Sequence, residues 1–156
     1  MNVKLLRKVE KRILAEPRRF DMMTFGTKLN KRTIKALGKQ APPCGTVACI
    51  AGHVDWMAHP RLFAASVALG DSVALGDYDD SIVERAAKEL GLGFELSQDT
   101  RESASNPRWR YAGRLFFDNE WPEKFQAALA EAKTPLQRAE VAVKRIEHFI
   151  KTNGKE

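Results

Sequence analysis

The chain has 156 residues, of which 44% are hydrophobic and 29% are charged, and its net charge is +6. This length and apolar content predict one compact domain whose core needs no cross-links. Two cysteines exclude a disulfide-rich secreted scaffold, and the lack of any run of about 18 apolar residues excludes a membrane span. Charged and apolar residues alternate irregularly at the N-terminus, unlike a secretory signal, so we expect a soluble cytoplasmic protein.

The first predicted element is an amphipathic helix over residues 2–16, which Pro17 ends because proline disfavours helix in the preceding residue. Its apolar face is expected to consist of five residues at helical spacing, namely Val3, Leu6, Val9, Ile13 and Leu14. A short apolar loop follows, which contains Phe20, Met22, Met23 and Phe25. We expect this loop to fill part of the core.

Residues 27–41 are a basic extension that forms either a short helix or a mobile loop, and two consecutive prolines end it. A second helix is predicted over residues 46–58, where small side chains allow a neighbouring backbone to approach closely. The sequence then repeats itself briefly, as VALGDS and VALGDY. Because Gly-Asp pairs mark turns, this echo indicates a short hairpin near residues 66–77.

Four further helices are expected in the second half of the chain. A capping box formed by Ser81 and Glu84 opens one that Gly91 ends, and the others cover residues 110–117, 121–133 and 134–153. The last helix has an apolar stripe of Leu136, Ala139, Val143, Ile146 and Ile150. Together these elements predict an all-α fold, a compact irregular bundle of five or six helices in a single domain over residues 1–156.

The stretch PPCGTVACIAGH, residues 42–53, holds both cysteines of the chain. If a helix begins near Thr46, Cys44 lies at its N-terminus, where free N–H groups and the helix dipole stabilise a thiolate. A cysteine-dependent enzyme would use this thiol as its nucleophile, with His148 or His53 as the base. His53 lies one turn beyond Cys49 on the same helix, so it cannot easily face Cys44.

Three other interpretations of this stretch remain open. With His53 and His59, the cysteines Cys44 and Cys49 suit zinc by residue type, although a single helix cannot turn all four toward one ion. A disulfide is possible if Cys44 precedes the helix, but a reducing cytoplasm disfavours it. The favoured interpretation is a buried helix seam in which cysteine acts as a small hydrophobe, formed by Ala48, Cys49, Ala51 and Gly52. No metal or other cofactor is predicted.

The order of the elements RFDM, CGTVACIAGH, KELGL, RLFFDNEWP and RAEVAVKRIEHFI resembles a group of small bacterial and phage-borne proteins. Members of that group carry a Cys-Gly-Thr-x-x-Cys-x-Ala-Gly motif after a Phe- or Trp-Asp-Met/Gln element. A tryptophan usually follows the motif, where His53 stands in this chain, and residues 27–40 look like an extension. The resemblance covers most of the chain and implies a shared helical fold and a prokaryotic or phage origin, but no reaction.

Charge is distributed unevenly, because residues 1–40 carry a net charge of +9 and residues 71–102 a net charge of −6. The basic extension contributes five cations that can contact phosphates, namely Lys28, Lys31, Arg32, Lys35 and Lys39. Trp109, flanked by Arg108 and Arg110, can stack on a nucleic-acid base. The alternative is a solvated surface, or one that pairs with the acidic segment.

These features favour a non-enzymatic role, as a small accessory protein of phage or mobile-element type. We expect it to bind a macromolecular partner, either an acidic protein or a nucleic acid, through its basic N-terminal surface. It is expected to be a monomer or a small homo-oligomer that does not contact membranes. An aromatic cluster provides either core packing or a groove for a protein partner; it consists of Phe116, Phe117, Trp121 and Phe125. The alternative functions are an enzyme that uses Cys44 and a nucleic-acid-binding protein.

Overall fold

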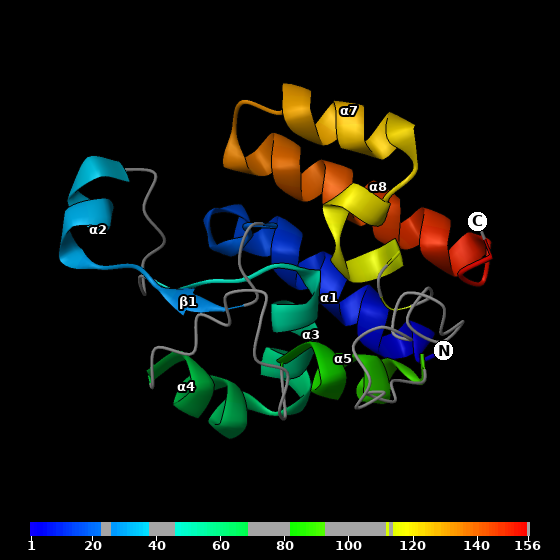
Figure 1. Cartoon of the computed structure of the whole chain (residues 1–156), viewed down its shortest axis with the longest axis horizontal. Helices are drawn as coiled ribbons and strands as arrows, with labels where there is room; N and C mark the ends of the chain where they lie inside the picture. The colour runs from blue at the N-terminus through cyan, green and yellow to red at the C-terminus, as the bar shows by residue number, and fades with distance from the viewer. Residues whose placement is uncertain (23–25, 38–45, 69–81, 93–111, 113, 156) are drawn as a thin grey trace, which may run out of the picture.

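The chain is mainly helical in the computed structural model, so the all-α prediction is confirmed (Figure 1). The structure describes residues 1–22, 26–37, 46–68, 82–92, 112 and 114–155. Its elements, in chain order, are α1 (Val3–Ala15), η1 (Pro17–Arg19), β1 (Thr27–Lys28), α2 (Lys31–Leu37), β2 (Thr46–Val47), α3 (Ile50–Ala58), α4 (Pro60–Ala68), α5 (Ile82–Leu90), η4 (Asp118–Glu120), α7 (Glu123–Glu131) and α8 (Pro135–Lys151). Among these residues, no helix has the length and apolar character needed to cross a bilayer.

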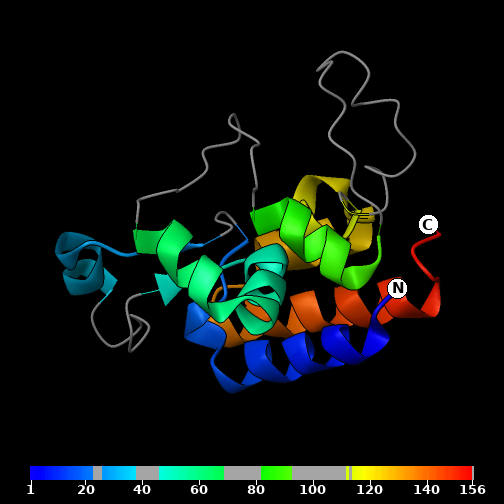
Figure 2. The ribbon, with the colours of Figure 1, turned by 90° about the horizontal axis from the view of Figure 1, so that it is seen from below.

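The longest helices, α1 and α8, lie side by side and run in opposite directions, which places the two chain ends close together (Figures 1 and 2). Helix α3 packs against α1 on one side and against α5 on the other, and α7 covers α8. Helix α4 packs on α3 at the edge of the bundle. Helix α2 lies apart from the other helices, at one end of the molecule (Figures 1 and 2).

The buried faces of α1 and α8 differ in part from the predicted stripes. Leu6, Val9 and Ile13 are fully buried, whereas Val3 and Leu14 are 38% and 42% exposed. These two residues flank the narrow stripe that meets α3 and α8, so including them in the apolar face was wrong. On α8 the buried residues are Ala139, Ala142, Arg145, Ile146 and Phe149, while the predicted Leu136 is exposed.

Signals at several helix ends are confirmed, whereas Ser81, the predicted cap of α5, lies outside the described residues. Thr134 caps α8 by accepting from the Gln137 N–H, and the Gln137 side chain accepts from the Thr134 N–H in return, which completes a capping box. Gly91 has a φ of +65° where α5 ends, and Gly154 a φ of +71° just after α8. Helix α7 begins at Glu123, two residues after the predicted start at Trp121, and Pro122 is its N-cap.

The start of α3 contradicts the sequence prediction. Thr46 and Val47 form strand β2, which pairs antiparallel with β1, and the helix begins only at Ile50 with Cys49 as its N-cap. Both residues are β-branched and therefore suit an extended backbone. The predicted hairpin near 66–77 is also wrong in its described part, since residues 66–68 belong to α4. Residues 69–77 lie outside the described part of the chain.

Candidate macromolecular interface

Residues 27–37, which we call the α2 arm, consist of strand β1 and helix α2. Thr27 pairs with Val47 and Lys28 with Thr46, so the arm starts from a short two-stranded ladder. The side chain of Asn30 then caps α2, because its Oδ1 accepts from the Thr33 N–H at 2.8 Å. Figures 1 and 2 place α2 beyond the C-terminal end of α1, away from the bundle.

A close backbone contact holds the base of the arm. A Cβ added to Gly26 would lie 2.7 Å from Cε2 of Phe63 and 3.3 Å from Cδ1 of Ile82. Phe63 is only 2% exposed and belongs to a small core cluster with Ala48 and Ile82. Glycine is therefore the residue that lets β1 approach α4 and α5 this closely, and the arm leaves the bundle at a fixed point.

Four of the predicted contact residues lie on the arm, and all four are exposed: Lys28, Lys31, Arg32 and Lys35. None of them forms an ion pair with a residue that the structure describes. No aspartate or glutamate occurs between Asp21 and Asp55 in the sequence. The arm therefore presents positive charge that local carboxylates do not neutralise.

Three arginines of α1 and η1 differ from the arm in this respect. Arg7 pairs with Glu10 at 2.9 Å and Arg12 with Glu16 at 3.4 Å. Arg19 also pairs with Glu16. A carboxylate that already pairs with a guanidinium competes with any external anion, so these three arginines are poorer contact points than the α2 arm.

The other predicted contact residues, Lys39, Arg108, Trp109 and Arg110, lie outside the described residues. Cys44, the predicted nucleophile, lies outside them as well. The helix start near Thr46, on which the thiolate hypothesis was based, is wrong, because α3 begins at Ile50.

The second cysteine is not placed for catalysis. Cys49 is fully buried, and burial raises the pKa of its thiol to about 12. Its neighbour His53 is also fully buried, and burial, reinforced by the charges of Arg12 and Arg19, lowers its pKa to about 4. A protonated thiol next to a weakly basic imidazole does not form a thiolate–imidazolium pair. The predicted burial of Ala48, Cys49, Ala51 and Gly52 is confirmed, although Ala48 and Cys49 precede the helix and so do not belong to a helix seam.

The described histidines do not assemble a metal site. Among the described residues there is no group of three or more His, Cys, Asp or Glu side chains that could hold an ion. His59 interacts with Glu89, with Nε2 and Oε1 3.2 Å apart. His148, the other predicted base, lies on α8 with its ring 5.4 Å from that of Phe125.

An aromatic stack between α3 and α4 was not predicted from the sequence. Trp56 stacks on Phe63 with centroids 5.2 Å apart and an interplanar angle of 8°. Its ring also lies 5.1 Å from the Arg12 guanidinium and 4.6 Å from that of Arg19. His53 continues the stack toward Phe20. The helical spacing of His53 and Trp56 was a usable signal, but their partners come from other elements.

An open hollow of about 380 Å³ lies between the segment after η1, the η4 turn and helices α7 and α8. It is lined by Phe20, Asp21, Met22, Asp118, Asn119, Gln126, Leu129, Ala130 and Arg138. The elements RFDM and RLFFDNEWP, far apart in the sequence, therefore border one surface feature. The aromatic cluster next to it is core, since Phe116 and Trp121 are buried and Phe117 and Phe125 pack against them.

The chain was compared with known proteins at three levels. Comparison of the chain with protein-family models, with curated proteins and with solved structures finds no match.

Proposed function

We propose that the chain is a non-enzymatic binding protein that contacts an anionic macromolecule through the α2 arm. The observation that carries this proposal is the set of four exposed cations on the arm, none of which pairs with a described carboxylate. We further propose that it acts in the cytoplasm as an accessory protein of phage or mobile-element type.

The position of the arm supports this role. The arm lies at one end of the molecule, and its base is held by the β1–β2 ladder and by the close contact of Gly26 with Phe63 (Figure 1). A cluster of unneutralised charge on such a projection attracts an oppositely charged partner over a Debye length and speeds their encounter. Because the base is fixed, less conformational entropy is lost on binding than with an unanchored tail.

A charge-reversal experiment tests the proposal. In the arm variant, Lys28, Lys31, Arg32 and Lys35 are replaced by Glu; in the control variant, the exposed residues Lys88, Lys124, Lys133 and Lys155 are replaced by Glu. Both changes alter the net charge equally. Retention on immobilised heparin, a generic polyanion, is measured as the salt concentration at elution.

We expect the arm variant to elute at a much lower salt concentration than the control variant, because the position of the charges matters as well as their number. Circular dichroism must show that both variants retain the helical content of the wild type. Equal elution of the two folded variants would overturn the assignment of the arm as the contact surface.

A further inference from the structure

We infer that the partner of this protein is a nucleic-acid duplex, held by its phosphates along a basic track that joins the α2 arm to the outer face of α1. This inference rests on the proposed function and names the partner. The track adds four cations to those of the arm, namely Lys4, Lys8, Lys11 and Arg18.

Three of these cations form a straight stripe on α1. Lys4, Lys8 and Lys11 are four and three residues apart, so they share one face of the helix. All three are exposed, and the buried residues Leu6 and Val9 lie on the opposite face. Like charges at this spacing destabilise an isolated helix by about 0.2–0.5 kcal/mol per pair. Helix stability therefore does not explain why three lysines share this face.

The stripe differs from the rest of α1 in its pairing. Arg7 and Arg12, on the flanks of the helix, pair with Glu10 and Glu16. Lys4, Lys8 and Lys11 form no ion pair with a described residue. The outward face of α1 therefore carries the same kind of unneutralised charge as the arm.

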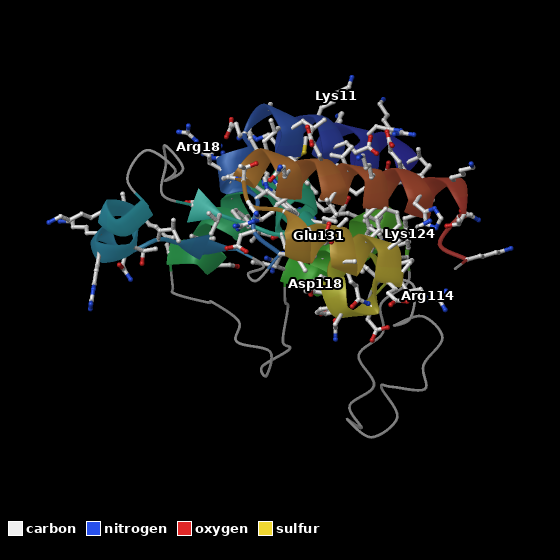
Figure 3. The ribbon with its side chains drawn as sticks, turned by 90° about the horizontal axis from the view of Figure 1, so that it is seen from above. Lys11, Arg18, Arg114, Asp118, Lys124 and Glu131 are labelled. Carbon is white, nitrogen blue, oxygen red and sulfur yellow. The ribbon has the colours of Figure 1, made fainter. Side chains whose placement is uncertain are left out.

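Arg18 links the stripe to the arm. In Figure 3, Lys11 points away from the bundle on the outer side of α1, and Arg18 lies between Lys11 and helix α2. Figures 1 and 2 agree that α2 lies beyond the end of α1 at which Arg18 occurs. The cations consequently follow one edge of the molecule instead of surrounding a pocket.

The composition of the track favours a phosphate backbone over an acidic protein. Six of its eight cations are lysines, and lysine is depleted in protein–protein interfaces, where aromatic and apolar anchors supply most of the affinity. From Lys4 to Lys11 the stripe covers about 10 Å, a length over which a duplex carries about six phosphate charges. Each cation can therefore find a phosphate in many registers, which predicts binding that tolerates any base sequence.

The aromatic side chains beside the track favour a duplex over a single strand. Single-strand binding relies on rings that stack on exposed bases. Trp56, next to the track, already has Phe63 on its ring and the guanidinium groups of Arg12 and Arg19 within 5.1 Å of its centroid. Phe20 is buried. Both rings pack against other side chains of the fold. The described part of the track therefore presents charged groups instead of rings on which bases could stack.

Three matched double variants test the inference by fluorescence anisotropy. They are Lys8→Gln/Lys11→Gln on α1, Lys31→Gln/Lys35→Gln on the arm, and Lys124→Gln/Lys133→Gln as the control on and after α7. The probe is a labelled DNA duplex of about 20 base pairs with an arbitrary sequence, titrated between about 50 and 200 mM KCl. A second duplex of unrelated sequence and a single strand of equal length are measured in parallel.

We expect each track pair to weaken duplex binding roughly tenfold and to reduce the slope of log K against log salt by about 2, because two phosphate contacts are lost. The control pair should leave the slope unchanged, and the two duplexes should bind equally. Tighter binding of the single strand, or an α1 pair that behaves like the control, would overturn the inference.

Polyglutamate of matched charge separates this inference from the proposed function. If polyglutamate binds as tightly as the duplex and only the arm pair weakens binding, the arm remains the contact surface but the partner is not a nucleic acid. If neither track pair changes the binding of any polyanion, both the inference and the proposed function fail.

Discussion

Asp55 of α3 and Arg85 of α5 form a two-pronged ion pair, with the Arg85 Nε–H and Nη2–H donating to the two Asp55 carboxylate oxygens at 2.8 Å each. The carboxylate is fully buried, and Arg85 also donates to the Ser66 hydroxyl at 3.3 Å. This pair joins two helices that pack directly against each other.

We expect Asp55→Asn to lower the free energy of unfolding by about 3 kcal/mol, because it leaves the guanidinium of Arg85 without its paired charge. Urea unfolding followed by circular dichroism measures the change. Glu89→Gln is the control: it breaks the half-exposed pair with His59 and should cost less than about 1 kcal/mol. Equal losses of unfolding free energy in the two variants would show that burial of the Asp55–Arg85 pair does not determine how much the pair stabilises the fold.

His53 makes stability depend on pH. Its pKa is lowered to about 4 by burial, whereas the unfolded chain has the ordinary value of 6.5, so the unfolded state binds the proton more readily. The contribution of neutral His53 to the free energy of unfolding is fully present above about pH 6.5. It is lost as the pH decreases toward 4, by roughly 3 kcal/mol in total. His53→Phe should remove this part of the pH dependence, which urea unfolding at pH 7 and pH 4.5 measures.

A control histidine keeps that experiment specific. His59→Gln changes a partly exposed ring and should retain the loss of stability between pH 7 and pH 4.5. If His53→Phe shows the same loss as the wild type, a group other than His53 accounts for the pH dependence.

Native alkylation distinguishes the two cysteines. Cys49 is buried and its pKa is raised to about 12, so almost none of it is thiolate at neutral pH. We expect the Cys44→Ser variant to resist iodoacetamide in the native state and to react fully in urea, as judged by mass spectrometry. Rapid native labelling of Cys49 would contradict its burial.

The same Cys44→Ser variant addresses the enzymatic alternative. A binding protein that uses the α2 arm should elute from heparin at the wild-type salt concentration after this substitution. Elution at a lower salt concentration would show that Cys44 contributes to polyanion binding. The thiol and the α2 arm would then belong to one surface.

Gly26→Ala tests how firmly the arm is held. The new methyl group would lie 2.7 Å from Cε2 of Phe63, so the ring or the strand must move. We expect a loss of about 1–3 kcal/mol in the free energy of unfolding, as for other overpacked sites. Adding Phe63→Leu should recover part of this loss. If the double variant loses as much free energy of unfolding as the two single variants combined, the result would argue against this contact.

Local signals were sufficient to predict most helices of this fold. The capping box of Thr134 and Gln137 and the left-handed Gly91 act within a few residues of the helix ends that they define, so they can be recognised in the sequence. The burial of Cys49 also follows from local composition. The absence of acidic residues around α2 likewise marked the arm before its position was known.

Other features depend on residues that are distant in the chain. Val47 was assigned to a helix because its pairing with Thr27 is invisible in local periodicity. Arg85 meets Asp55 across 30 residues, and nothing within either helix selects that partner. Helix α4 was missed because proline at position 60 indicated the end of one helix and also begins the next.

The ladder at the base of the arm has an evolutionary consequence. The chain leaves the bundle at Lys28 and returns at Thr46, and these two residues face each other in the ladder. Because the ends of the excursion are already joined, changing its length alters the closure entropy only slowly, by about 0.6 kcal/mol per doubling. The segment can therefore diverge in length and charge, or be exchanged between related chains, while the bundle beneath it keeps its sequence.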